Sequence, residues 1–184
     1  MTGFSLRPLL MGDPSAWPRQ EILVGKERHV ACQEAPDSGG TPMRALRTAD
    51  YLYIRNYRPA RWPAGTPNFE EAYIPGSWYG DIDNGPTKLF MWENRASSAE
   101  LANLFELSFE KRPAEELYDL TRDPHQLENV ARNPDYEGVR RELSSRLEKE
   151  LRASEDPRVM GNGSVFDHYP YYGGTPMAPP QVED

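Results

Sequence analysis

The stretch "EELYDLTRDPHQLENVA" (residues 115–131) has the pattern of a strand, a turn and a short amphipathic segment in succession. Residues 116–120 hold Leu and Tyr in a run typical of a strand at the edge of a sheet. The triplet at 122–124, Arg-Asp-Pro, predicts a turn, because Asp and Pro favour turn conformations. We therefore expect this turn to direct the next helix back across the sheet.

The segment 134–153 predicts that helix. Asn133 is suited to cap it, Pro134 to take the first helical position, and Asp135 to lie at the positive end of the helix dipole. Its apolar side chains form one narrow stripe, which a sheet must cover. The stripe consists of Tyr136, Val139, Leu143, Leu147 and Leu151.

The segments before residue 58 predict the rest of the sheet. Residues 3–11 predict a short helix or turn, and "EILVG" (21–25) predicts a strand whose apolar run suggests burial on both faces. The sequence "MRALRTADYLYIRNY" (43–57) predicts a β-hairpin with its turn at Ala49-Asp50.

The middle and the end of the chain differ in regularity. Residues 58–96 predict a long loop rich in Pro, Gly and aromatic residues, and residues 97–109 predict a helix capped by Ser97 or Ser98. Residues after 156 show no periodicity and predict an extended tail, either draped over the domain or partly disordered. The expected fold class is α+β, a small antiparallel sheet of about four strands with helices packed on one face.

Composition excludes some classes of partner. The net charge is -8 at pH 7 over 184 residues, which disfavours nonspecific nucleic-acid binding. The sequence has no run near the ~20 apolar residues of a membrane span, and its first residues have no signal-peptide pattern. Lys and Arg outnumber Asp and Glu in residues 1–65, so an anionic ligand is drawn to that third of the chain first; the alternative is that these basic residues are simply solvated.

Motifs for metal binding or nucleophilic catalysis are weak. The three histidines lie far apart, without metal-ligand spacing. The sequence "DIDNG" (81–85) resembles the start of a calcium loop but lacks its later glutamate, and the more ordinary interpretation is a turn closed by Asn84-Gly85. Cys32, the single cysteine, has no predicted helix start beside it, so a catalytic thiol is not expected there. From these motifs together we predict neither a catalytic residue nor a metal site in this chain.

The sequence "GKERHV" (25–30) is the best candidate for ligand contact. It places Lys26, Glu27, Arg28 and His29 at the end of a predicted strand, where side chains often face ligands. The alternative is that these loop residues pair with one another.

The quoted stretches together resemble the sulfatase family, most closely its heparan N-sulfatase (sulfamidase)-type members. "EELYDLTRDPHQLENVA" followed by one amphipathic helix is similar to the C-terminal signature of that family. "GKERHV", "TPMRALRTADYLYIRNY" and "GDIDNGPTKLFMWENR" are similar to its matching upstream regions, in the same order. The resemblance covers roughly residues 3–155 and places the chain in the family's C-terminal subdomain.

This resemblance implies an architecture. The subdomain would be a small antiparallel sheet crossed by its C-terminal helix, docked on a large alkaline-phosphatase-like catalytic domain. Residues 1–20 would then be the residual end of that N-terminal domain, 21–156 the subdomain, and 157–184 an extended tail. The partners implied are the missing catalytic domain and a sulfated carbohydrate.

The resemblance also implies a chemistry that this chain does not contain. Sulfatases convert the Cys or Ser of a C/S-x-P-x-R motif into formylglycine and use Ca²⁺ to stabilise the sulfate oxygens. No such motif occurs in the 184 residues, because "SAWPR" (15–19) and "SEDPR" (154–158) place proline one position late. Both cofactors would lie in the N-terminal domain, and we expect this chain to be inactive alone.

By the same resemblance, Arg28 and His29 are the expected substrate contacts, with Glu27 and Arg44 beside them. An alternative function is a non-catalytic module that binds anionic carbohydrate or a protein partner, and a third is an inactive remnant stable as a homo-oligomer. The family is usually periplasmic, extracellular or lysosomal, and the compartment of this chain stays open.

Overall fold

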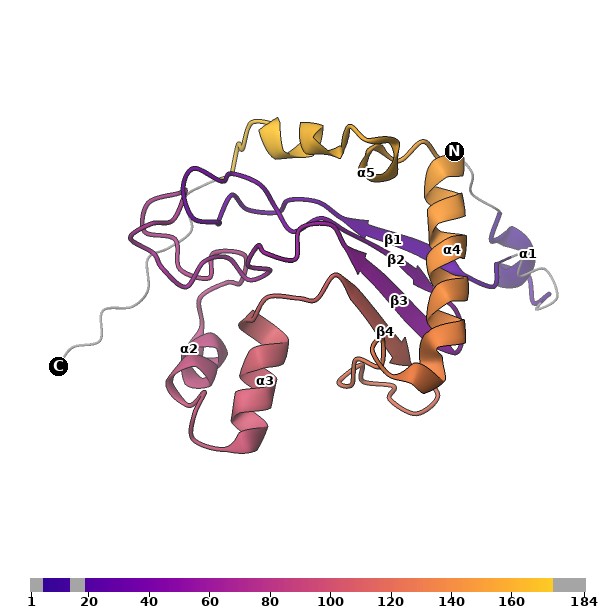
Figure 1. Ribbon diagram of the computed structural model, residues 1–184, viewed down its shortest axis with the longest axis horizontal. Helices are drawn as coiled ribbons and strands as arrows, with labels where there is room; N and C mark the ends of the chain where they lie inside the picture. The colour runs from indigo at the N-terminus through magenta and orange to yellow at the C-terminus, as the bar shows by residue number, and fades with distance from the viewer. Residues whose placement is uncertain (1–4, 14–18, 174–184) are drawn as a thin grey trace.

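The computed structural model describes residues 5–13 and 19–173. Its centre is an antiparallel sheet in the order β1-β2-β3-β4, formed by β1 (Ile22–Lys26), β2 (Met43–Arg47), β3 (Tyr51–Asn56) and β4 (Glu115–Asp119). Figure 1 shows the helix α4 (Glu137–Ala153) crossing the strands. The predicted α+β class and the strand number are confirmed. None of the helices within the described ranges has both the length and the apolar character needed to cross a bilayer.

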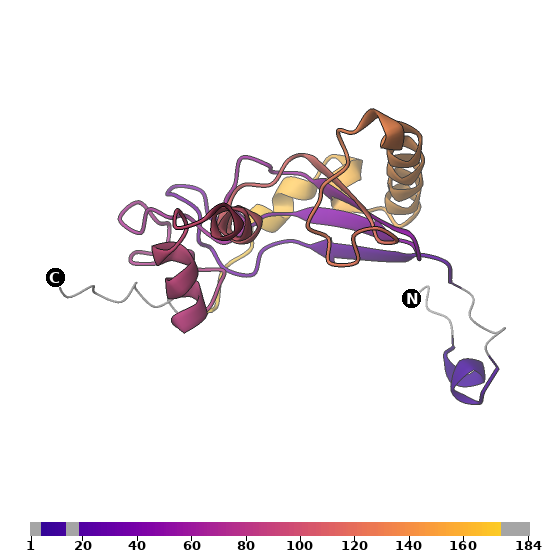
Figure 2. The same cartoon turned by 90° about the horizontal axis from the view of Figure 1, so that it is seen from below.

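One face of the sheet and α4 form the main core. Leu46 of β2 lies opposite Tyr53 of β3, and Tyr53 lies opposite Leu117 of β4, so three large side chains form a row across the sheet. Figure 2 shows α4 on one side of the sheet. Its side chains on that side pack against the row and are almost fully buried: Leu143, Leu147 and Leu151. The predicted apolar stripe is therefore confirmed in its inner positions.

The start of this helix follows the predicted capping chemistry with a small change. The Asn133 side chain accepts a 3.0 Å hydrogen bond from the backbone N–H of Asp135, as an N-cap does. The first turn is a 3-10 turn, η2 (Pro134–Tyr136), and the α-helix itself begins at Glu137. Tight 3-10 turns are common at helix ends, because they satisfy backbone groups that the α-helix leaves free.

The prediction that residues 21–25 form a strand buried on both faces is wrong about burial. The strand exists as β1, but Ile22, Leu23 and Val24 are 45%, 43% and 42% exposed. The reason is that α4 packs against β2 and β3, and the side chains of β1 lie outside the main core. A short apolar run carries no information about which elements cover the two faces of a strand.

The predicted hairpin is confirmed. Strands β2 and β3 pair from Met43↔Asn56 to Arg47↔Leu52, and Thr48 organises the turn. Its hydroxyl accepts a 2.9 Å hydrogen bond from the backbone N–H of Tyr51. This side-chain cap takes the place of the Asn-Gly chemistry that short hairpin turns prefer.

The segment predicted as one long loop, 58–96, contains the helix α2 (Pro86–Glu93). It packs beside α3 (Ala99–Phe109), and both lie away from α4 (Figure 1). The predicted cap of α3 is confirmed, because Ser98 Oγ accepts a 3.1 Å hydrogen bond from the Leu101 N–H. The loop and the two helices enclose a second core, made of Ala64, Trp78, Tyr79, Phe105 and Phe109.

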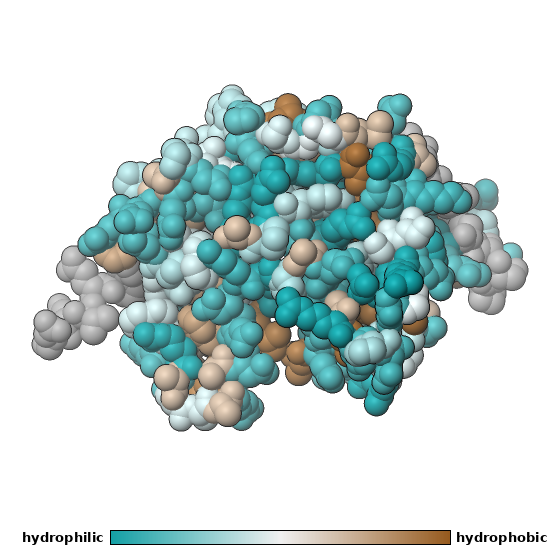
Figure 3. All heavy atoms as spheres, in the orientation of Figure 1, coloured by the Kyte–Doolittle hydropathy of each residue, from teal (hydrophilic) through white to brown (hydrophobic). Residues whose placement is uncertain are grey.

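The ends of the described chain add short helices. The helix expected within residues 3–11 is α1 (Arg7–Leu10). The segment after 156 holds α5 (Pro157–Met160) and the 3-10 helix η3 (Gly163–His168), drawn in yellow tones at the top of Figure 1. The face seen in Figure 3 is mostly hydrophilic, with hydrophobic side chains in small separated patches. The predicted boundaries at 20 and 156 stay predictions.

Candidate functional site

The residues predicted to contact a ligand lie where β1 ends, and there the structure adds an unforeseen carboxylate. Asp81 lies in the loop that follows Trp78 and Tyr79 of the second core. Its Oδ2 accepts a 2.8 Å hydrogen bond from Lys26 Nζ. Its Oδ1 lies 2.8 Å from His29 Nδ1. The Asp81 side chain is only 8% exposed, whereas those of Lys26 and His29 are 40% and 73% exposed. An inner carboxylate thus holds two outer basic side chains.

Backbone hydrogen bonds hold the loop that carries Asp81. The Asp81 N–H donates to Ala64 O at 3.0 Å, and the Tyr79 N–H donates to Thr66 O at 3.0 Å. The Thr66 N–H in turn donates to Cys32 O at 2.7 Å. Three segments far apart in the sequence are therefore joined directly behind the carboxylate.

Lys88 of α2 fixes the same loop from inside. Its ammonium donates to Trp78 O, Tyr79 O and Ile82 O at 2.8–3.0 Å and to Asn84 Oδ1 at 2.9 Å. Burial lowers the pKa of Lys88 to about 8, against the opposing charge of Asp83. A buried ammonium with carbonyl partners on both sides of residue 81 sets the direction in which Asp81 points.

The "DIDNG" segment consequently folds as a turn bound by lysine. Asn84 Oδ1 accepts a hydrogen bond from the Lys88 ammonium, and the two carboxylate oxygens of Asp81 contact Lys26 and His29. Within residues 5–13 and 19–173, no three His, Cys, Asp or Glu side chains converge as metal ligands would. The donor set of this segment therefore does not fit a calcium ion.

Cys32 lies behind this site as an inert thiol. It is buried, and burial raises the pKa of its thiol to about 12, with the charge of Asp81 adding to the rise. The thiolate is the nucleophilic form of cysteine, so this side chain is protonated and unreactive at neutral pH.

Glu27 and Arg44, two of the four predicted contact residues, are turned into an internal ion-pair network. Arg44 Nη2 binds Glu27 Oε1 at 2.7 Å, and Arg44 Nε binds Asp156 Oδ2 at 2.7 Å. Arg158 binds the other oxygen of Glu27 at 2.5 Å. The Arg44 side chain is 8% exposed, so its guanidinium is committed to these carboxylates.

The network continues to the C-terminal segment through Asp167. This carboxylate binds Arg61 at 3.1 Å and Arg158 at 3.4 Å, and Arg61 also binds Asp37 at 2.7 Å. Ion pairs from Arg158 and Asp167 therefore fasten residues 157–168 to the domain.

Acid should release this fastening. Burial by itself raises the pKa of Asp167, but hydrogen bonds and charges from Arg61 and Arg158 outweigh it and leave the pKa below its usual value. A depressed folded pKa means that the stabilisation is complete above the unfolded value of about 3.9 and is lost as the pH falls through the folded pKa. We expect Asp167→Asn to cost about 1.5–3 kcal/mol at pH 7 and to flatten the stability profile below pH 4, measured by urea unfolding at stepped pH. A parallel acid profile in both proteins would contradict this.

Arg28 occupies an intermediate position. Its Nη1 donates to Ser38 O at 3.0 Å, its Nη2 donates to Tyr169 O, and its guanidinium lies 6.0 Å from the centre of the Tyr171 ring. The tail therefore lies against Arg28, and His29 is the most accessible of the four predicted residues. The sequence gives no signal that links Lys26 to Asp81, because 55 residues separate them.

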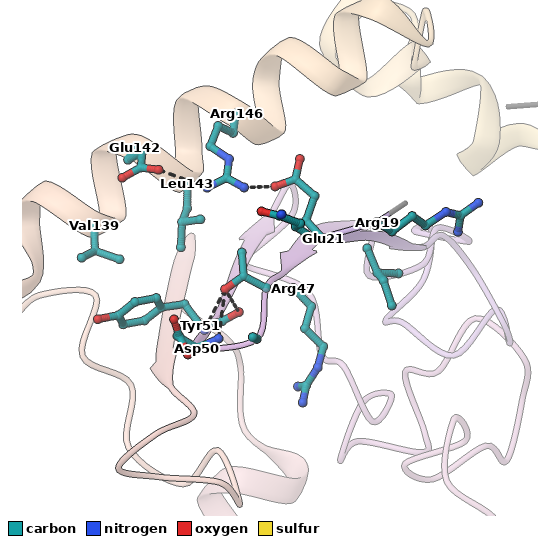
Figure 4. Close-up of a pocket in the computed structure, with 13 residues that line it drawn as sticks. Arg19, Glu21, Arg47, Asp50, Tyr51, Val139, Glu142, Leu143 and Arg146 are labelled. Carbon is teal, nitrogen blue, oxygen red and sulfur yellow. Dashed lines mark hydrogen bonds and ion pairs between the residues drawn. The ribbon is translucent and has the colours of Figure 1, made fainter. Parts of the chain in front are cut away.

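A cavity of about 630 Å³ lies at the other end of the strands, between the β2–β3 turn and α4 (Figure 4). Part of its charged rim is self-paired: Arg146 binds Glu142 at 3.0 Å and also forms an ion pair with Glu21. It lies away from the predicted contact residues, since β2 begins near Lys26 and ends at Arg47.

Comparison with known proteins links the chain to one enzyme class. The chain is 31% identical over 149 residues to an ulvan-active sulfatase from Formosa agariphila. The chain is related to sulfatases. The match covers 78% of this chain but only 23% of the curated relative, so the sulfatase-related chain spans about a quarter of that protein. No family model matches the sequence.

Solved structures give looser matches. A 2-O GAG sulfatase superposes with a TM-score of 0.49 at 17% identity, over 96% of this chain and 27% of that one. A protein solved with its substrate D-glucosamine-2-N,6-O-disulfate superposes with a TM-score of 0.44 at 18% identity, over 85% and 21%. The fold of the sulfatase-related chain is the four-stranded sheet crossed by α4 that is described above.

Proposed function

We propose that this chain is the C-terminal portion of a sulfatase that acts on a sulfated carbohydrate of the heparan type. It supplies one wall of the substrate cleft, and a partner catalytic domain supplies the nucleophile. One observation carries the proposal: 149 residues align with a sulfatase, yet they amount to 23% of its length. The absence of a C/S-x-P-x-R motif from this sequence agrees with that division.

The role of this chain would be to bind and orient. The exposed Lys26 ammonium and His29 imidazole can donate to the oxygens of an anionic sugar. Arg28 can add a guanidinium if the contacts with the tail open. No metal-dependent step is assigned to these residues, because the acidic side chains here are committed to basic partners.

A non-catalytic module for anionic carbohydrate is the second candidate. The observation that favours it is the same pair of exposed basic groups, held in place without help from another chain. The two candidates differ in the length of the polypeptide that the cell makes: a full sulfatase in the first case and a chain of 21.0 kDa in the second.

Peptide mapping of the native protein from its source cells separates them. We expect a polypeptide much larger than 21.0 kDa whose tryptic peptides include both the 115–131 region and a formylglycine peptide. A native protein of 21.0 kDa that binds an N-sulfated glucosamine disaccharide, but not its desulfated counterpart, would establish the binding module instead. A native protein of that size with no such binding would overturn both proposals.

A further inference from the structure

We propose that Asp81 is a positioning residue, which holds Lys26 and His29 as a two-point site for an anionic oxygen group of a sugar. The inference rests on the proposed function and adds a residue to it. Asp81 itself would not touch the ligand, since it is buried behind the two basic side chains that it orients.

The division of labour within the carboxylate supports this role. Lys26 Nζ and His29 Nδ1 each lie 2.8 Å from a different oxygen of Asp81, so neither competes with the other. An ammonium carries three N–H donors, and a protonated imidazole carries one N–H on Nδ1 and another on Nε2, on opposite sides of the ring. Each basic group therefore keeps a donor directed away from Asp81 while its position is held.

Stability alone does not explain the arrangement. Ion pairs with largely exposed partners contribute little to folding, and burying a carboxylate has a desolvation cost. Here the acid is buried and both partners are exposed, the His29 ring most of all. Such a geometry does little for the fold, but it presents two fixed donors to solvent.

The surroundings keep Asp81 from moving. Lys88 binds carbonyl groups on either side of it, at Tyr79 and Ile82. Gly65 has a φ of +92°, and a Cβ there would lie 2.6 Å from the backbone nitrogen of Gly80, so the two loops touch through backbone atoms. The pre-organised carboxylate can therefore orient its partners before a ligand arrives.

Lys26 also borders a space of the right character for the rest of the sugar. It lines a pocket of about 270 Å³ together with Met43, Ile54, Arg58 and Arg112. The apolar side chains offer a surface for a sugar ring, and the two arginines add positive charge. Lys26 is the member of the two-point site that borders this pocket, so a ring bound there would bring its anionic group beside Lys26.

Variants of Asp81 in the full chain test the assignment. The probes are inorganic sulfate and glucuronate, and NMR follows the His29 ring nitrogens and the bound fraction. In the wild-type chain we expect an Nδ1–H signal that Asp81 protects from exchange with solvent, and ring shifts that saturate with one or both probes. Asp81→Ala should remove this protection and weaken binding by about tenfold, the equivalent of one charge-assisted hydrogen bond. Asp81→Asn should restore part of the Nδ1–H protection and part of the affinity.

Glu70→Ala is the matched control, since Glu70 is an exposed acid of the same long loop, 58–96. It should leave the Nδ1–H protection and the binding unchanged. Should Asp81→Ala fail to fold, Lys26→Met and His29→Gln take its place, and each is expected to weaken binding at least threefold.

Two results would overturn the inference: unchanged Nδ1–H protection and affinity in Asp81→Ala, or no ring response to either probe in the wild type. Saturation by sulfate alone identifies a sulfate group as the ligand, and saturation by glucuronate alone identifies a carboxylate. Neither failure affects the peptide map of the native protein, so the proposed function is judged separately.

Discussion

Replacing Arg44 by methionine is expected to lower the free energy of unfolding by about 3–5 kcal/mol. The guanidinium is nearly buried and binds both Glu27 and Asp156 at 2.7 Å. Methionine fills similar space but leaves Asp156 without its cation, and Glu27 with Arg158 alone, in a partly desolvated site. Removing one member of a buried ion pair costs more than the pair contributes, because the remaining charge is uncompensated. Urea unfolding followed by circular dichroism measures the effect.

Arg47→Met is the control for this change. Arg47 lies three residues along the same strand but is exposed, so its replacement should alter the unfolding free energy by less than about 0.5 kcal/mol. The double variant that also carries Asp156→Asn should recover part of the loss, because the carboxylate left without a cation is then gone. Equal losses for Arg44→Met and Arg47→Met would show that the network contributes nothing to stability.

Leu147→Ala is expected to destabilise the chain by about 2–5 kcal/mol. Leu147 lies at the centre of α4 with 0% exposure and packs in the cluster that contains Leu46, Tyr53 and Leu117. Alanine is a good helix former, so the loss comes from apolar burial and from the cavity left against the sheet. The same unfolding experiment gives the magnitude.

Leu104→Ala provides the comparison, because Leu104 lies in α3 and is 37% exposed. Its loss should be well under half that of Leu147→Ala. A similar cost at both positions would mean that α4 does not seal the main core in the way its buried leucines indicate.

Local chemistry made much of the fold predictable. The positions before apolar periodic runs predict caps at Asn133 and at Ser97 or Ser98, and Asn133 and Ser98 make the expected hydrogen bonds. The stripe through Leu143, Leu147 and Leu151 identified the buried face of α4. These features depend on neighbours within a few residues, which periodicity and capping rules describe well.

Long-range features were less accessible. The exposure of Ile22 depends on which strands α4 covers, and no residue of β1 encodes this. Helix α2 was missed because its short sequence has no clear apolar stripe and begins at Pro86 within a region rich in Pro and Gly. Lys88, a charged residue in that helix, is buried only because three backbone carbonyls happen to surround it.

The candidate site shows the same division. The sequence by itself determined that basic residues gather at the end of β1, that Arg28 and His29 are among them, and that the chain holds no C/S-x-P-x-R motif. Only the tertiary structure decided that Glu27 and Arg44 face inward, and that Asp81 comes from a distant loop to hold Lys26 and His29. The physical reason is that a side chain's chemistry is local, whereas its burial and its partners depend on segments that meet only when the chain folds.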